Sequence, residues 1–179
     1  MATESKDDEI TLRRPTSEDG PDVWRLIRDS GSLDENSRYF NLVQCDFFGD
    51  TCVIAEMGGE VVGWVSAFIT PEDPETLFVW QVAVDEKARG KGLAKWMLTD
   101  LLEREACADV KRIHTTITAD NEASWALFNS FADRVDAPLE RDAHFERNRH
   151  FEGRHETEYM VTIGDFENPA TKGNETGSD

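Results

Sequence analysis

The chain has 179 residues, which is enough for one well-packed domain and gives no reason to expect a second. Its 37 acidic residues outnumber 19 basic ones, and the resulting net charge of −18 opposes binding to nucleic acid or to an anionic membrane. The sequence contains no apolar run of about 18 residues, and its first residues carry no apolar signal segment, so we expect a soluble, cytoplasmic protein.

The N-terminal half of the chain predicts five elements, in the order strand, helix, helix, strand, strand. Their ranges are residues 10–14, about 16–29, about 36–45, 51–56 and 61–69. Thr16 or Ser17 can cap the first helix, and Gly31 ends it. Gly58 and Gly59 separate the last two strands, which is typical of a β-hairpin.

The C-terminal half predicts three strands and two helices. Their ranges are strand 77–84, helix about 91–106, strand 112–118, helix about 121–132 and strand 156–163. Strand 77–84 is nearly all apolar, as expected of a central strand covered on both faces, whereas the charged residues 133–155 are predicted to be irregular. We therefore expect a single domain over residues 10–164, between a disordered N-terminus at 1–9 and a disordered acidic tail at 165–179.

The strongest functional signal lies in residues 85–94, DEKARGKGLA, which join the central strand to the next helix. A strand, a glycine turn and a helix N-terminus aim several backbone N–H groups at one point. Gly90 and Gly92 permit a positive φ and the close approach of an anion, and Arg89 and Lys91 reverse the sign of an otherwise acidic chain. Many turns need glycine for geometry alone, but the flanking cations favour a pyrophosphate site. The segment matches neither the phosphate-binding P-loop nor the dinucleotide fingerprint.

Two motifs here resemble those of the GNAT superfamily of N-acetyltransferases. Residues 89–94, RGKGLA, resemble its acyl-CoA motif, and residues 121–131, NEASWALFNSF, resemble the helix that follows it beside the pantetheine. The resemblance implies an α/β (α+β) fold whose central sheet is mixed and mostly antiparallel, with a parallel, splayed pair of strands and helices on both faces. It also implies acetyl-CoA as the co-substrate. The residues implied to bind it are Val82, Val84, Arg89, Gly90, Lys91, Gly92, Leu93, Ala94, Asn121 and Phe128.

Three further segments resemble one branch of that superfamily, whose members acetylate the γ-amine of L-2,4-diaminobutyrate in ectoine synthesis. The segments are residues 33–42, 78–84 and 155–161. This resemblance implies N4-acetyl-L-2,4-diaminobutyrate and CoA as products, and a homodimeric assembly.

A diamino acid carries two ammonium groups and one carboxylate, so its pocket needs hydrogen-bond acceptors as well as donors. The residues expected to bind it are Asp34, Tyr39, Trp80, His155 and Glu158. Other roles stay open for three of them. Asp34 can cap the following helix, Trp80 can belong to the core, and Glu158 can face solvent from its strand.

Acetyl transfer requires a neutral amine, because an ammonium has no lone pair with which to attack the thioester. Glu158 and Asp34 are the catalytic candidates for taking its proton, directly or through water. The thiolate that leaves must gain a proton, for which the family often uses a tyrosine at the position of Phe128. Because phenylalanine has no hydroxyl, Tyr159, His155 and water are all open as the acid.

The cysteines and histidines do not indicate a metal site. The cysteines are odd in number and lack close pairing, so we interpret them as reduced core thiols: Cys45, Cys52 and Cys107. Three histidines lie in a polar stretch without cysteine partners, and we expect no metal there: His144, His150 and His155.

Two other functions fit the same sequence signals. One is an N-acetyltransferase for a different small amine or amino acid, and the other is a catalytically silent acyl-CoA-binding module. The acidity suits either a well-solvated surface or a saline interior, and it identifies no substrate.

Overall fold

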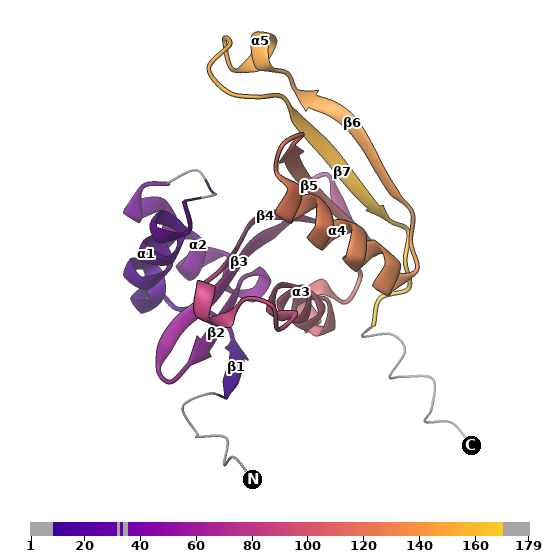
Figure 1. Ribbon diagram of the computed structural model, residues 1–179. Coiled ribbons are helices and arrows are strands. Elements are labelled where there is room, and N and C mark those ends of the chain that lie inside the picture. Colours follow the sequence, from indigo (N-terminus) through magenta and orange to yellow (C-terminus); the bar gives the residue numbers. More distant parts are fainter. Residues whose placement is uncertain (1–8, 32, 34–35, 170–179) are drawn as a thin grey trace, which may run out of the picture.

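The computed structural model describes residues 9–31, 33 and 36–169 (Figure 1). Within these residues the strands form one 7-stranded sheet in the order β1-β2-β3-β4-β5-β7-β6. The strands are β1 (Ile10–Arg13), β2 (Val53–Met57), β3 (Glu60–Thr70), β4 (Asp73–Val84), β5 (Arg112–Thr118), β6 (Leu139–Phe145) and β7 (Glu158–Gly164). The α-helices are α1 (Gly20–Ser30), α2 (Arg38–Phe47), α3 (Leu93–Glu103), α4 (Glu122–Val135) and α5 (Arg147–His150).

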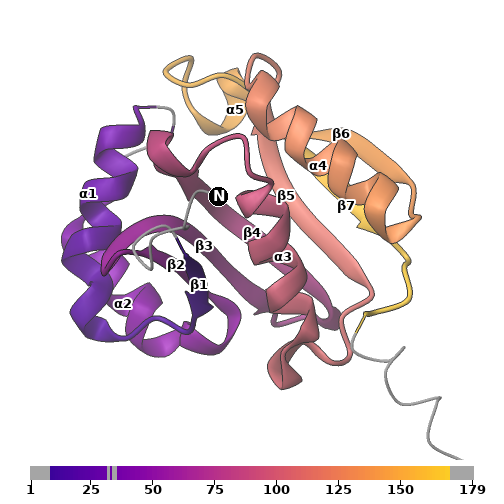
Figure 2. The same ribbon diagram turned by 60° about the horizontal axis from the view of Figure 1, so that its bottom comes forward.

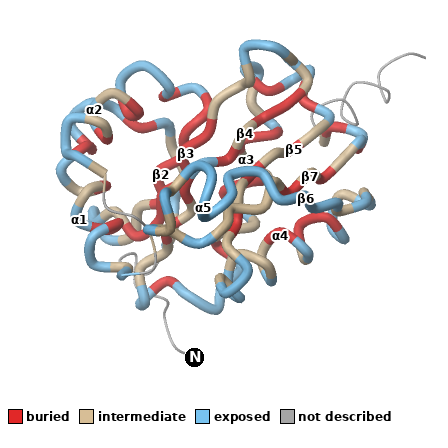
Figure 3. The backbone as a smooth tube through the Cα atoms, turned by 90° about the horizontal axis from the view of Figure 1, so that it is seen from above, coloured by how far each residue is buried: buried red, intermediate tan, exposed pale blue. Residues whose placement is uncertain are grey.

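Helices cover both faces of the sheet, and the alternation of side chains along β2 shows why. Val53 and Ala55 pack into the cluster built with α3 and α4, whereas Ile54 between them packs into the cluster built with α1 and α2. Figure 2 shows α3 and α4 in front of the sheet, and Figure 3 shows the buried segments concentrated on its inner strands. The predicted fold class is confirmed.

The β4–β5 pair is parallel and splayed. The two strands are paired only from Thr76 with Arg112 to Phe78 with His114, although β4 runs on to Val84 and β5 to Thr118. All other paired strands in the described part of the chain are antiparallel. The two strands therefore leave backbone groups unpaired with each other beyond Phe78.

Most predicted elements lie where the sequence placed them, but the prediction of irregular structure over residues 133–155 was wrong. α4 continues to Val135, and residues 139–145 form β6, which pairs with β7 at the edge of the sheet. Nearly every residue of β6 is exposed, so the strand lacks the apolar alternation that would have revealed it. β6 is defined as a strand by its pairing with β7. Together with α5 it projects beyond the rest of the molecule (Figure 1).

The packed part of the chain also extends past the predicted boundary at residue 164. Phe166 is buried, and the side chain of buried Asn168 donates hydrogen bonds to the carbonyl oxygens of Cys107 (2.8 Å) and Val110 (3.0 Å). The disorder predicted for 1–8 and 170–179 concerns residues outside those described. No helix in the described ranges is long and apolar enough to cross a membrane.

The cysteines are buried and free: Cys45, Cys52 and Cys107. Burial raises the pKa of the Cys45 and Cys52 thiols to about 12 and that of Cys107 to about 11. Such thiols stay protonated at neutral pH and are poor nucleophiles.

Candidate active site

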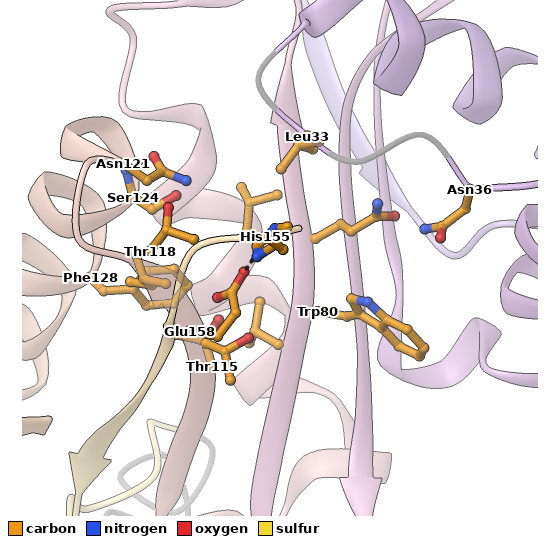
Figure 4. A pocket seen from close by; sticks show the side chains of 15 residues that line it. Leu33, Asn36, Trp80, Thr115, Thr118, Asn121, Ser124, Phe128, His155 and Glu158 are labelled. Atoms are coloured by element: carbon orange, nitrogen blue, oxygen red, sulfur yellow. Dashed lines mark hydrogen bonds and ion pairs between the residues drawn. The ribbon is translucent and has the colours of Figure 1, made fainter. Parts of the chain in front are cut away.

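A cavity of about 270 Å³ opens where β4 and β5 diverge (Figure 4). Its lining comes from β4, β5, α4, the start of β7 and the segment before α2. The lining residues are Leu33, Asn36, Val79, Trp80, Gln81, Val82, Thr115, Thr116, Ile117, Thr118, Asn121, Ser124, Phe128, His155 and Glu158. The site is thus assembled from segments that are far apart in sequence.

The glycine turn has the backbone conformation that the sequence predicted. Gly90 and Gly92 have φ values of 74° and 72°, and no atom lies within 4 Å of where a Cβ would stand on either. Gly92 is the N-cap of α3, so the N–H groups of the first helical turn begin at Leu93. A cavity of about 220 Å³ lies over this turn, and Leu127 of α4 lines its other side. The open N-terminus and the positive φ values fit a pyrophosphate.

Two cations are held at this turn. The Arg89 Nε donates a hydrogen bond to the carbonyl oxygen of Val84 (3.1 Å), and Lys95 Nζ donates to Ser130 Oγ (3.0 Å). Lys91 is exposed on the turn itself. Together these groups give the turn a local positive charge in a chain of net charge −18, which favours an anion.

Residues of α4 line the first cavity along one face of the helix. Asn121 caps the helix, because its Oδ1 accepts a hydrogen bond from the Ser124 N–H (3.1 Å). Asn121, Ser124 and Phe128 are spaced by three and four residues, which puts them on the same face. Phe128 is 3% exposed and presents a ring, not a hydroxyl, to the cavity.

His155 and Glu158 face each other in the cavity (Figure 4). The His155 Nε2 lies 3.8 Å from Glu158 Oε1. On the other side of the ring, Nδ1 lies 2.7 Å from the carbonyl oxygen of Glu156. A carbonyl oxygen only accepts, so Nδ1 carries the hydrogen and the neutral ring has its lone pair on Nε2. The cavity therefore contains a carboxylate with an imidazole beside it, and the carboxylate suits an ammonium group.

Trp80 lies at a β-bulge in β4. Ser66 of β3 pairs with Gln81 and Ala67 pairs with Val79, so Trp80 is the extra residue. Its ring packs edge-on against Phe40 of α2, with ring centroids 4.8 Å apart. Because Trp80 is 47% exposed and lines the cavity, it is not an ordinary core residue.

The remaining predicted substrate residues divide into two cases. Tyr39 is 76% exposed on α2 and does not line the cavity in the described part of the chain. Asp34 lies outside the described residues, although Leu33 and Asn36 on either side of it line the cavity.

The sequence interpretation missed the polar side chains that β5 and β4 add to the cavity. They are Thr115, Thr116, Thr118 and Gln81, with Ser124 from α4. The run of threonines in a strand that follows the glycine turn was the available signal. It is weak, because threonine is also common in strands for its β-branched shape.

No group of three or more metal-ligating side chains comes together within the described ranges. His155 lies near a carboxylate, whereas His150 accepts a hydrogen bond from the Glu146 N–H through its Nδ1 (2.8 Å).

Comparison with known proteins finds acetyltransferases. Residues 21–132 match the acetyltransferase (GNAT) family. The chain is 50% identical over 158 residues to the L-2,4-diaminobutyric acid acetyltransferase of Methylotuvimicrobium alcaliphilum, covering 88% of this chain and 92% of the relative. It is 45% identical over 159 residues to the protein of the same name from Marinococcus halophilus, covering 89% and 92%.

Solved structures agree. Diaminobutyrate acetyltransferase EctA from Paenibacillus lautus, in complex with its substrate L-2,4-diaminobutyric acid and coenzyme A, superposes with a TM-score of 0.85 at 46% identity, covering 90% of this chain and 98% of that one. N-acetylglutamate synthase from Neisseria gonorrhoeae has a TM-score of 0.65 at 18% identity over 90% of this chain and 36% of that one, which speaks for the fold alone.

Proposed function

Because this chain belongs to the acetyltransferase (GNAT) family, we propose that it transfers the acetyl group of acetyl-CoA to the γ-amine of L-2,4-diaminobutyrate in ectoine synthesis. The observation that carries the proposal is the likeness, at 46% identity and a TM-score of 0.85, to an enzyme that holds this diamino acid and coenzyme A. The products would be N4-acetyl-L-2,4-diaminobutyrate and CoA.

The glycine turn supports the proposed binding of acetyl-CoA. The N–H groups at the start of α3 and the cations Arg89, Lys91 and Lys95 suit the pyrophosphate. Beyond the last β4–β5 pair, the backbone of Val82 and Val84 is free of β5 and suits the pantetheine amides. When bound, acetyl-CoA supplies an activated acyl carbon at the cavity, and the remaining requirements fall on the protein's own side chains.

The first requirement is that the ammonium group of the substrate be deprotonated to the neutral amine. We infer that Glu158 and His155 Nε2 bind the reacting ammonium, and that Glu158 takes the proton directly or through water. Asp34 stays a second candidate for this role. The neutral amine attacks the thioester carbonyl carbon and the C–N bond forms. As the C–S bond breaks, the attacking nitrogen loses its second proton to solvent or to a basic group in the cavity, and the thiolate gains a proton.

Two observations bear on the source of the proton that the thiolate gains. Phe128 carries no hydroxyl, and Tyr159 points to the other face of β7, where Arg141 lies 5.9 Å from the centre of its ring. We therefore propose a water molecule or the protonated His155 as the donor.

Assembly and location belong to the proposal as well. We propose a homodimer, supported by large apolar side chains of and next to α2 that stay exposed on one copy: Tyr39, Phe47 and Phe48. A cytoplasmic location is supported by the three buried free thiols, which suit a reducing compartment.

One assay tests the function. Free-thiol release from acetyl-CoA should be fastest with L-2,4-diaminobutyrate among a panel of diamino acids and simple amines, and NMR of the product should find the acetyl group on the γ-nitrogen. Faster release with another amine would assign the enzyme to that amine. Tight acetyl-CoA binding without amine-dependent thiol release would mean a silent acyl-CoA-binding module.

A further inference from the structure

The loop between β6 and β7 is held closed by contacts of Arg147. Its carbonyl oxygen accepts a hydrogen bond from the Gly153 N–H (2.9 Å), and its own N–H donates to Thr157 Oγ1 (3.1 Å). Its guanidinium also pairs with Glu156 at 2.5 Å. The loop that carries His155 is therefore a folded scaffold, although it projects from the body of the protein (Figure 1).

Within this scaffold Phe151 lies against His155. The two ring centroids are 4.6 Å apart with an angle of 41° between the planes. Phe145, the last residue of β6, is the next ring, with its centroid 6.4 Å from that of Phe151. The His155 side chain is 31% exposed, and its contact with Phe151 limits the rotamers that it can adopt.

The orientation of this ring decides what the cavity presents to substrate. With Nδ1 on the Glu156 carbonyl oxygen, the Nε2 lone pair faces Glu158. A ring rotated about its Cβ–Cγ bond would lose the carbonyl bond and turn a different edge to Glu158. The bond to Glu156 fixes which edge of the ring faces Glu158, and the Phe151 ring, tilted by 41° against the imidazole, restricts rotation of the imidazole plane.

We propose that Phe151 is a positioning residue for the acetyl transfer, which holds the His155 imidazole with Nδ1 protonated and Nε2 directed at Glu158. The kinetic part of this inference rests on the proposed function, whereas the tautomer of His155 is a property of the protein alone. Phe151 is not among the residues that line the cavity, and it acts through the ring that it contacts.

The experiment compares Phe151→Leu with Phe145→Leu, a matched change at the end of β6 whose ring contacts do not include His155. ¹⁵N NMR of the histidine rings at about pH 8.5, well above the ordinary histidine pKa of about 6.5, reports which nitrogen of His155 carries hydrogen. We expect the Nδ1–H form in the wild type and in Phe145→Leu, and a mixture of both tautomers in Phe151→Leu.

Kinetics give the second readout. Phe151→Leu should lower kcat/KM for L-2,4-diaminobutyrate by about tenfold or more, because a small displacement of a catalytic group is costly. The KM for acetyl-CoA should change by less than about twofold, and Phe151→Tyr, which keeps the ring, should restore both readouts.

The outcomes separate the two proposals. If the wild type does not acetylate diaminobutyrate, the proposed function is refuted. If Phe151→Leu nevertheless loses the Nδ1–H form of His155, the positioning role is supported. If Phe151→Leu keeps the tautomer, or if Phe145→Leu loses as much activity as Phe151→Leu does, the positioning role is refuted.

Discussion

Glu158 and Tyr159 are adjacent in the chain but face opposite sides of the sheet. The Glu158 carboxylate lines the cavity with Oε1 3.8 Å from His155 Nε2, whereas the Tyr159 ring lies 5.9 Å from the Arg141 guanidinium on the α4 side. The alternation of a β-strand separates them. Of this pair, Glu158 lines the cavity and Tyr159 does not.

Glu158→Gln keeps the shape of the side chain and removes its charge. If Glu158 takes the amine proton, we expect kcat to fall by roughly 100-fold at neutral pH and to recover in part at high pH, where free amine is abundant. Steady-state thiol release as a function of pH measures this. The exposed Glu103→Gln on α3 is the control. A raised KM with unchanged kcat would instead make Glu158 an anchor, and no change beyond about twofold would remove it from the site.

Gly92→Glu tests the pyrophosphate site. The substitution puts a carboxylate in the open space above the helix N-terminus, so we expect acetyl-CoA affinity to fall by about 10- to 100-fold, the worth of one or two charge-assisted hydrogen bonds. Calorimetry measures the affinity. Gly59→Glu is matched, because Gly59 also has a positive φ (81°) and open space around its missing Cβ, but it lies in the β2–β3 turn. Equal loss of affinity in both variants would mean general backbone strain.

Trp80→Ala tests the wall of the substrate cavity. An indole face can attract an ammonium group, so we expect KM for diaminobutyrate to rise by about tenfold while KM for acetyl-CoA stays the same. Trp96→Ala on α3 is the control, since Trp96 is 48% exposed and Trp80 is 47% exposed. If both variants raise KM for diaminobutyrate equally, Trp80 does not recognise the ammonium group.

Asp19→Asn tests an ion pair that fixes β1 to the start of α1. Two hydrogen bonds from Arg13, at 2.7 and 2.8 Å, hold the pKa of the Asp19 carboxyl below its usual value of 3.8. A lowered pKa in the folded state stabilises the fold above the unfolded pKa, and this stability is lost as pH falls through the folded value. We expect Asp19→Asn to cost about 2 kcal/mol at neutral pH, less than a fully buried pair because Arg13 is partly exposed.

Urea unfolding at several pH values measures this effect. The difference between the wild type and Asp19→Asn should be constant at neutral pH and should shrink below about pH 4. Asp29→Asn, whose partner Arg28 is exposed with it, should leave the free energy of unfolding unchanged within error. A difference between the wild type and Asp19→Asn that does not depend on pH would show that lost packing, not charge, is responsible.

Local features of this protein were readable from the sequence because each depends on residues that are neighbours in the chain. The glycine turn needs only Gly90, Gly92 and the helix that begins after them, and the structure gives both glycines the expected positive φ. The β-hairpin at Gly58 and Gly59 likewise follows from one turn between two apolar strands.

Other features depended on tertiary structure. β6 is polar and exposed along almost its whole length, so nothing but its pairing with β7 defines it as a strand. The cavity joins Trp80, Phe128 and Glu158 from three elements, and it exists because β4 and β5 separate after Phe78. The sequence determined which turn has the backbone to bind an anion, because that ability depends on the local φ values of Gly90 and Gly92 and on the N-terminus of α3. Only the packing of distant strands decided which side chains line the cavity, because the face that each strand presents is fixed by its partners across the sheet.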